Sequence, residues 1–357
     1  MRPAACLAAI ILATGAAHAD ETQRQQLVRT AVESVILPGY AGFDAASGRL
    51  ADHVAGLCTA PSEAGLEKAR AAFGEVVEAW SQIEYVQFGP VRADNRLERI
   101  LFFPDRRGIG LKQIQQWIGK PGDGKPDAAS MPARSAAVQG LPALEFTLFG
   151  SGSEALAGTG GAWRCAVGQA IAGNVASIAG DVLADWQGDT GIRRDLENPD
   201  EGNALYRSAD EALAQVLKVL PNGYEMMEET RLKPVLGDDP ASAKPKAALF
   251  WRSGLTARAL SANLDGLAAL AAIDGIADGL PDDLRSWVPG NIAFETAQAK
   301  ALLAASGNDL PSGAATAEGH ARLMVVAGQL ESLRDTSATG ILGGYGLAAG
   351  FSSLDGD

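Results

Sequence analysis

The chain has few histidines, cysteines and aromatic residues, and these shortages exclude several kinds of site. Its 357 residues include three histidines and three cysteines, and 6% are aromatic. One histidine lies in the N-terminal segment, which leaves His53 and His320. A zinc hydrolase takes two or three imidazoles with a carboxylate, and neither histidine has ligand spacing to the other or a His-Glu-x-x-His motif. We therefore expect ordinary helix residues here rather than a histidine-rich catalytic metal site.

Other sequence patterns of catalysis are also missing. The residues from Gly150 to Ser153 lack the Gly-x-Ser-x-Gly form of a hydrolase nucleophile, and we expect a loop there. The glycines of residues 340–346 are not followed by Lys-Ser or Lys-Thr, so they do not predict a phosphate-binding loop. Met226 and Met227 could suggest a soft metal site, but adjacent helix residues point in different directions, which favours core packing.

The N-terminus has the layout of a secretory signal peptide. Arg2 precedes an apolar run from Ala4 to Ala13, and Ala17-His18-Ala19 forms a small-residue end, so we expect cleavage after Ala19 and removal of residues 1–19. No later stretch supplies the roughly 20 apolar residues of a transmembrane helix. We expect a periplasmic or otherwise exported protein. Its net charge of −13 should repel nucleic acid and anionic lipid, so neither is an expected partner.

Two cysteines, Cys58 and Cys165, remain once residues 1–19 are removed. In an oxidising exported compartment two cysteines are expected to pair, and we predict a disulfide between them. Closing a loop of this length stabilises a fold by roughly 4 kcal/mol in the chain-entropy model. The alternative is two unpaired thiols buried in helix cores.

The clearest periodicity along the chain is helical. Apolar residues recur at spacings of three and four over residues 66–83, after Pro61-Ser62, and over residues 163–186, before Gly188. No strand-like alternation of useful length competes with this pattern. Further helices are predicted at residues 22–57 with a break at Pro38-Gly39, 203–232 with a break at Pro221-Asn222-Gly223, 245–272, 281–306 and 317–336.

A polar segment rich in proline and glycine, Asn198 to Asn203, separates two groups of periodic segments. The processed chain exceeds the roughly 250–300 residues at which a single core stops growing. We therefore predict an all-α protein of two helical-bundle halves, residues 20–197 and 198–357. Long loops are expected at residues 105–110 and 121–132, and an irregular Gly-rich C-terminus at residues 340–357.

Glu145 is a carboxylate in a strongly apolar neighbourhood, between Leu144 and the run from Phe146 to Phe149. A buried carboxylate is costly unless it is paired, binds a cation or titrates at a high pH. Glu145 is therefore the leading candidate for a functional residue. The alternative is a structural ion pair with an arginine of the other half, such as Arg252.

Several segments together resemble the imelysin-like family, also called the peptidase M75 group. The resemblance covers nearly the whole processed chain and rests on residues 88–91 after Trp80, 99–106, 138–146, 244–245 with 251–255, and 350–357. It implies two helical-bundle halves from an internal duplication, a site at their junction, an exported setting and an association with iron acquisition. Some members of the family are described as insulin-cleaving peptidases and others as metal-binding components of uptake systems.

The chain departs from this family at two positions of the expected site. The family motif Gly-x-His-x-x-Glu is matched at Gly140 and Glu145, but Pro142 occupies the histidine position. Proline can neither bind a metal nor act as a base. Leu249 also stands where relatives often have a glutamate. Hydrolysis needs an activated water and a base, so both changes argue strongly against a hydrolase. They argue less against the binding of a hard cation, which accepts oxygen ligands alone.

The leading prediction is a non-catalytic binding component of an envelope iron-acquisition system. Glu145, Arg252 and Ser253 would hold a metal, iron or another divalent cation, or a metal complex, at the junction of the two bundles. One alternative is an interaction module for an envelope protein partner, in which Pro142 shapes a helix start and Glu145 pairs with an arginine. The other is a metallopeptidase, which the missing ligands disfavour.

Overall fold

The computed structural model describes residues 21–122, 124, 126–188 and 190–348, and over these residues the protein is built from helices and turns without any β-strand. The predicted all-α class and the arrangement in two halves are confirmed. The predicted signal peptide, residues 1–19, and the family-like C-terminal run, residues 350–357, lie outside the described residues.

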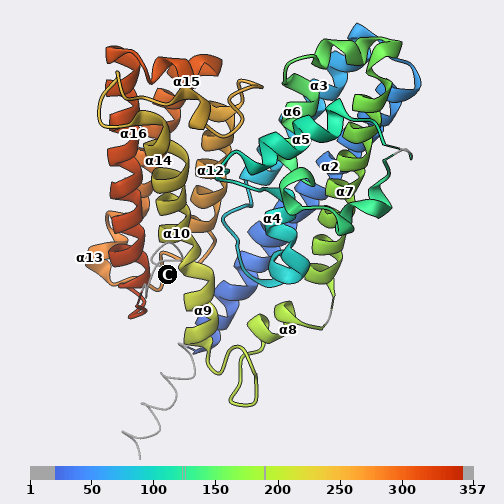
Figure 1. The fold of residues 1–357 in the computed structure, drawn as a ribbon. Coiled ribbons are helices and arrows are strands. Elements are labelled where there is room, and N and C mark those ends of the chain that lie inside the picture. The colour runs from blue at the N-terminus through green and yellow to red at the C-terminus, as the bar shows by residue number, and fades with distance from the viewer. Residues whose placement is uncertain (1–20, 123, 125, 189, 349–357) are drawn as a thin grey trace, which may run out of the picture.

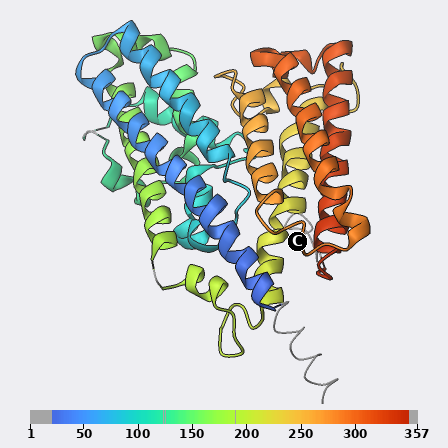
Figure 2. The ribbon, with the colours of Figure 1, turned by 180° about the vertical axis from the view of Figure 1, so that it is seen from behind.

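The helices form two bundles that lie side by side (Figures 1 and 2). In the first bundle, helical residues 21–31 and the π-helical turn Val32–Ile36 lead into α2 (Leu37–Thr59), α3 (Glu63–Ser81), α4 (Arg96–Ile100), α5 (Ile109–Gly119), α6 (Leu141–Phe149), α7 (Ala162–Gln187) and α8 (Ile192–Glu197). The second bundle contains α9 (Ala209–Leu217), α10 (Val219–Glu225), the π-helix η7 (Met226–Leu232), α11 (Lys233–Leu236), α12 (Thr256–Ala271), α13 (Asp282–Arg285), α14 (Val288–Ser306), α15 (Leu310–Gly313), α16 (Ala317–Asp335) and the π-helix η10 (Thr336–Leu342).

Aromatic side chains fill the core of the first bundle, where α2 packs against both α3 and α7. Phe43 of α2 meets Trp80 of α3 with ring centroids 4.9 Å apart, and Tyr40 stacks on Trp186 of α7 at 6.2 Å. All four side chains are fully buried. Burying each large apolar side chain stabilises the fold by about 1.5–3 kcal/mol. The start of α3 is as predicted, because the Ser62 side chain accepts a hydrogen bond from the N–H of Gly65.

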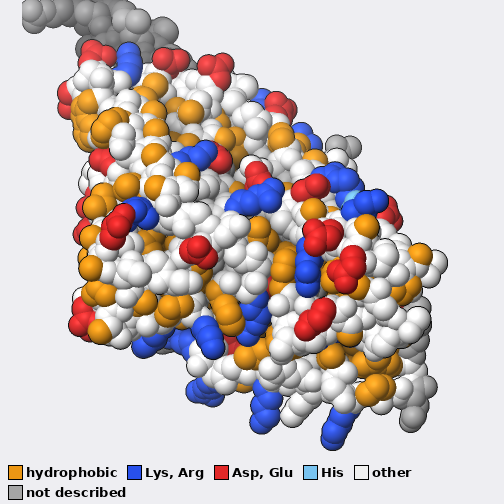
Figure 3. Space-filling view, turned by 90° about the horizontal axis from the view of Figure 1, so that it is seen from above, with side chains coloured by type: hydrophobic (Ala, Val, Ile, Leu, Met, Phe, Trp, Pro, Cys, Tyr) orange, Lys and Arg blue, Asp and Glu red, His pale blue; other side chains and the backbone are white. Residues whose placement is uncertain are grey.

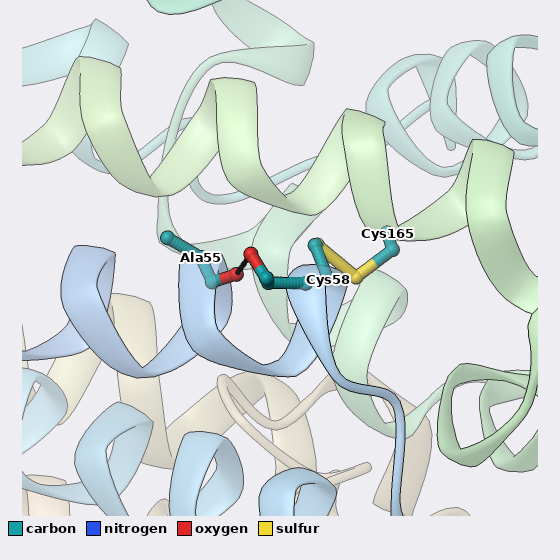
Figure 4. Close-up of a disulfide and its surroundings, with 4 residues drawn as sticks. Ala55, Cys58 and Cys165 are labelled. Carbon is teal, nitrogen blue, oxygen red and sulfur yellow. Dashed lines mark hydrogen bonds between the residues drawn. A yellow bond between two sulfur atoms is a disulfide. The ribbon is translucent and has the colours of Figure 1, made fainter.

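A disulfide joins Cys58 at the end of α2 to Cys165 in α7 (Figure 4). The pairing is the one that the sequence predicted. Beside it, the Thr59 hydroxyl donates a hydrogen bond to the carbonyl of Ala55 at 2.9 Å and closes the last turn of α2. The bond links residues 107 positions apart, so it restricts a long loop of the unfolded chain.

Two predicted helix breaks are not where the sequence placed them. The chain stays helical through Pro38, which lies in the first turn of α2 directly after the π-helical turn. Proline has no N–H to donate within a continuing helix, and the wider π-helical turn before it accommodates the ring. Pro221 likewise lies within α10, and the interruption falls at Lys218, between α9 and α10.

Three other boundaries differ from the prediction. The segment expected as one helix over residues 281–306 is interrupted at Ser286-Trp287, because Pro289 sits in the first turn of a new helix, α14. The last helix continues beyond α16 as η10 to residue 342, so the irregular C-terminus begins later than residue 340. Helix α5 starts at Ile109, inside the loop expected at residues 105–110.

The largest correction concerns residues 245–272, of which only α12 is a regular α-helix. Residues 245–247 form a single 3₁₀ turn, and residues 248–255 form an irregular loop. This loop reaches from the second bundle to the first and supplies part of the site described below.

Close contact between α12 and the end of α3 joins the two bundles. The Tyr85 hydroxyl donates a hydrogen bond to the Gly266 carbonyl at 2.7 Å, and the Asn263 amide donates to the Ser81 carbonyl at 2.7 Å. A Cβ atom on Gly266 would lie 2.1 Å from the Gln82 carbonyl oxygen, so only glycine permits this approach. The boundary predicted at residues 198–203 falls in the turn segment between α8 and α9 and stays a prediction.

One described helical stretch, residues 159–187, is long and apolar enough to cross a membrane by length and composition alone. In the fold, 61% of its most apolar window is buried inside the bundle. Its composition is accounted for by its place in the core as α7.

Charged side chains of both signs lie on the outside of the protein. Figure 3 shows acidic and basic side chains interspersed over one face, so the excess of negative charge, −13 for the whole chain, does not form a single acidic patch on that face.

Candidate functional site

A cavity of about 270 Å³ lies at the junction of the two bundles. The first bundle contributes residues around 102–111 and the start of α6, and the second contributes η7, α11 and the loop before α12. Much of its wall is apolar, with the aromatic side chains Phe102, Phe103, Phe146, Phe250 and Trp251. The cavity also includes Pro142, Glu145 and Arg252, which the sequence singled out.

Glu145 lies on α6 at this cavity and is 3% exposed. Its Oε1 atom accepts two hydrogen bonds from Ser253, one from the backbone N–H at 2.9 Å and one from the hydroxyl at 2.8 Å. Its Oε2 atom lies 3.9 Å from Nη1 of Arg252. The structure therefore brings together Glu145, Arg252 and Ser253, the three residues that the sequence proposed for one site.

Burial sets the ionisation of this group of residues. Loss of solvent raises the pKa of the Glu145 carboxyl, and the hydrogen bonds from Ser253 and the charge of Arg252 oppose that rise. Burial also lowers the pKa of Arg252, which the charge of Glu145 opposes. The carboxyl is thus easier to protonate than an exposed glutamate, even though it has a cation beside it.

The Arg252 side chain lies among aromatic rings. Its guanidinium carbon is 4.4 Å from the centroid of the Trp251 ring and 5.5 Å from that of Phe146. A guanidinium that lies over an aromatic ring is attracted by the ring face and keeps its N–H groups at the edge. Within the described part of the chain, no hydrogen bond from the Arg252 side chain is formed, and its ion-pair contact with Glu145 is long.

The loop of residues 248–255 holds Ser253 in place through an unusual backbone. Phe250 has a φ of 60°, in the left-handed region that non-glycine residues avoid. Its side chain is 1% exposed and meets Phe73 of α3 edge-on at 5.9 Å. The Thr256 hydroxyl donates to the Leu249 carbonyl at 2.7 Å, and the Ser253 hydroxyl is 3.1 Å from the Phe250 carbonyl. Burial of Phe250 thus maintains a strained turn that directs the N–H of Ser253 towards Glu145.

The motif residues Gly140 and Pro142 have structural roles at the start of α6. A Cβ atom on Gly140 would lie 2.1 Å from the Ile100 carbonyl oxygen, so the motif glycine allows the chain to pass closely. Pro142 lies in the first turn of α6, where a missing N–H costs no helical hydrogen bond. Its ring lines the cavity. At the position of the family's histidine, the cavity therefore has an apolar surface.

The acidic residues of the cavity are already engaged by neighbours. Asp105 accepts hydrogen bonds from three backbone N–H groups at the start of α5, at 2.7–3.2 Å. Glu229 forms an ion pair with Lys233 at 2.5 Å. Glu145 is bound by Ser253 and faces Arg252. Each carboxylate that lines this cavity therefore already has a hydrogen-bonding or cationic partner among the described residues.

These contacts allow a test of whether the residues fit a protein-bound metal ion. Among the described residues there is no group of three or more His, Cys, Asp or Glu side chains that could hold one. A guanidinium 3.9 Å from Oε2 of Glu145 would also repel a cation placed there. His53 is exposed on α2, His320 is buried in α16, and neither lines the cavity. The side chains present do not fit a bare iron ion.

Two cationic side chains at the cavity were not predicted as site residues. Arg106 and Lys246 line it, and the Lys246 ammonium lies 5.7 Å from the centroid of the Trp251 ring. Arg106 ends one of the segments that resembles the imelysin-like family, and Lys246 follows another. Their places in or next to these segments are a sequence signal for the site. Nothing in their local sequence shows that the fold brings the two residues together.

A second cavity, of about 570 Å³, lies on the other side of Phe103 and Pro104. Here the buried Glu84 accepts hydrogen bonds from Arg231 at 2.9 Å and from Asn263 at 2.8 Å. The Arg231 guanidinium also lies over the Phe103 ring at 4.9 Å. Glu84 thus repeats the arrangement of Glu145, since each is a buried carboxylate of the first bundle that binds donors of the second.

The fold and the site define an all-α protein of two packed bundles with a cavity at their junction. The chain belongs to the imelysin family, whose model matches residues 36–336. A comparison with curated proteins found no match.

Solved structures of other proteins share the fold. One is an imelysin-like protein from Psychrobacter arcticum, with a TM-score of 0.73 and 21% identity over 93% of this chain and 98% of that one. The other, from Parabacteroides distasonis, is described as an iron-regulated protein A precursor. Its TM-score is 0.67 at 14% identity, over 90% of this chain and 95% of that one.

Proposed function

We propose that this protein is an exported, non-catalytic binding component of an iron-acquisition system, with its ligand site in the cavity around Glu145, Arg252 and Ser253. The ligand is a metal complex, in which small organic groups supply the donor atoms to the metal. Membership of the imelysin family and a structural relative described as iron-regulated support the connection with iron. A signal peptide at residues 1–19 would export it to the periplasm.

One observation carries the choice of a complex over a bare ion. The carboxylate of Glu145 accepts two hydrogen bonds from Ser253 on one oxygen and faces the Arg252 guanidinium with the other. A bare cation would have to displace these partners and approach a fixed positive charge. A complex that carries its own oxygen ligands needs neither change.

The same geometry argues against hydrolysis. A metallopeptidase needs a metal-bound or base-activated water. Pro142 offers neither a ligand nor a base, and Leu249 adds only apolar surface to the cavity. The one motif carboxylate left, Glu145, is bound by Ser253 rather than open to water.

Equilibrium dialysis of the purified protein tests this proposal. Ferrous iron alone, zinc alone, ferric citrate and the ferric complex of 2,3-dihydroxybenzoate are offered at equal metal concentrations, and bound metal is measured. We expect retention of iron only from a ferric complex, and a loss of at least tenfold in affinity in Arg252→Met. Stoichiometric retention of bare ferrous iron or zinc that disappears in Glu145→Ala would show that the protein itself coordinates the metal, contrary to the proposal.

A protein-interaction module is the second candidate. It is favoured by the two hydrogen bonds from Ser253, which join Glu145 to the other bundle without any ligand. In that case the motif is structural, and affinity capture from envelope extracts would return a specific protein. Glu145→Gln would then lose stability while capture of the partner by the folded fraction stays unchanged.

A further inference from the structure

We infer that the ligand of this cavity is a flat aromatic anion, a ring that carries a carboxylate or phenolate group, either free or as the chelating part of a metal complex. This inference rests on the proposed function, because it names the chemistry of the ligand for the same site. It follows from the charge, the shape and the aromatic character of the cavity.

The acids and the cations of the cavity differ in their partners. The acids Asp105, Glu145 and Glu229 each have a partner within the protein, as described above. The cations are different. Arg106 and Lys246 form no ion pair or side-chain hydrogen bond within the described part of the chain, and Arg252 has only the long contact with Glu145. The three acids and three bases of the lining balance in formal charge, but the charged groups left without a hydrogen-bonding partner are the cations. Their free N–H groups favour an anionic acceptor.

Cations and aromatic rings lie together in the cavity wall. Arg252 lies over Trp251 at 4.4 Å and near Phe146 at 5.5 Å, and the Lys246 ammonium lies 5.7 Å from the centroid of the Trp251 ring. A guanidinium over a ring still has N–H groups free, and their fork binds a carboxylate or two adjacent oxygens. The rings beside it offer stacking surface. An oxyanion on an aromatic ring uses both features.

The size of the cavity limits the ligand. Ligand cavities commonly measure roughly 300–1,000 Å³, and this one measures about 270 Å³. It has room for one or two rings and not for a whole large chelate. A larger complex would insert one aromatic arm and leave the remainder at the cavity mouth.

Isothermal titration calorimetry with 2,3-dihydroxybenzoate as the probe tests the inference. Its methyl ester is the matched uncharged ring, and citrate is the matched anion without a ring. We expect the probe to bind at least tenfold more tightly than either control. Arg252→Met keeps the aliphatic stem but removes the charge, and should weaken binding of the probe tenfold or more. Arg106→Met should weaken it by a smaller factor.

Arg107→Met is the control variant, because Arg107 is exposed, adjacent to Arg106 and not part of the cavity wall. It should bind like the wild type, and circular dichroism checks that every variant is folded. If citrate or the ester binds as tightly as the probe, or if folded Arg252→Met binds the probe normally, the inference is wrong. If ferric citrate is still retained, only the inference fails and the proposed function stands. If no ferric complex is bound, both fail.

Discussion

Glu145 and Ser253 are 108 positions apart in the chain, and two hydrogen bonds of 2.9 and 2.8 Å join them across the two bundles. Both bonds end on the same oxygen of Glu145, so the other oxygen is left facing Arg252 at 3.9 Å. The motif glutamate thus acts as an anchor between the bundles, and the positive groups around it face the cavity.

Removing the Ser253 hydroxyl should destabilise the protein. In Ser253→Ala the backbone N–H still binds Glu145, but the buried carboxylate loses one of its two donors on Oε1, which should cost about 1–3 kcal/mol. The midpoint of urea unfolding measures this loss. Ser312→Ala, at an exposed position of α15, is the control and should change stability by less than about 0.5 kcal/mol. Equal midpoints for Ser253→Ala and the control would contradict the anchoring role.

The pH dependence of stability should report the ionisation of Glu145. Burial raises its pKa in the folded protein above the value of about 4.3 in the unfolded chain. Between these two pKa values the folded state binds more protons, so the contribution of Glu145 to stability is present at low pH and is lost as the pH rises. We expect the stability of the wild type relative to Glu145→Gln to fall from about pH 4 upwards and then to level off. Urea unfolding of both proteins at several pH values measures the difference, and a constant difference would show that the pKa is unshifted.

Reducing the disulfide should destabilise the first bundle. The bond between Cys58 and Cys165 spans 107 positions, and a loop of about 100 residues corresponds to roughly 4–5 kcal/mol in the chain-entropy model. The double variant Cys58→Ala and Cys165→Ala should unfold at a clearly lower urea concentration than the oxidised protein. Adding reductant to the wild type should give a similar loss and should leave the double variant unchanged. No loss in either experiment would mean that the bond does not form in solution.

The contact between α12 and the end of α3 should tolerate only glycine at position 266. In Gly266→Ala the new Cβ would meet the Gln82 carbonyl oxygen at 2.1 Å, so the bundles must separate slightly, at a cost of about 1–3 kcal/mol. Gly290→Ala is the matched control, since Gly290 is exposed in α14 with nothing within 4 Å of a new Cβ. The control should stabilise the helix by up to about 1 kcal/mol. Two substitutions with the same effect on thermal unfolding would rule out the close packing.

Local signals made several features predictable from the sequence. Ser62 caps α3 with its side chain, and α7 ends at Gly188, which is extended. Both positions were predicted because helix ends depend on the residues next to them. The disulfide followed from the cysteine count and the expected compartment. The resemblance pointed to a site at the junction, where Glu145, Arg252 and Ser253 do meet.

The loop before α12 could not be predicted in the same way. The residues Ala248, Leu249 and Phe250 continue an apolar pattern that favours helix, and only the burial of Phe250 against Phe73 explains the turn. Arg252 was the expected partner of Glu145, yet the hydrogen bonds come from Ser253. The backbone of this turn decides which residue reaches the carboxylate, and that depends on packing between the bundles rather than on local sequence.

Native mass spectrometry of the protein, purified from its source cells without tags or chelators, tests the central claim most directly. The account predicts iron together with the mass of an organic chelator in a one-to-one complex, and the loss of both in folded Arg252→Met. Iron bound without any organic mass, and lost in Glu145→Ala instead, would contradict it.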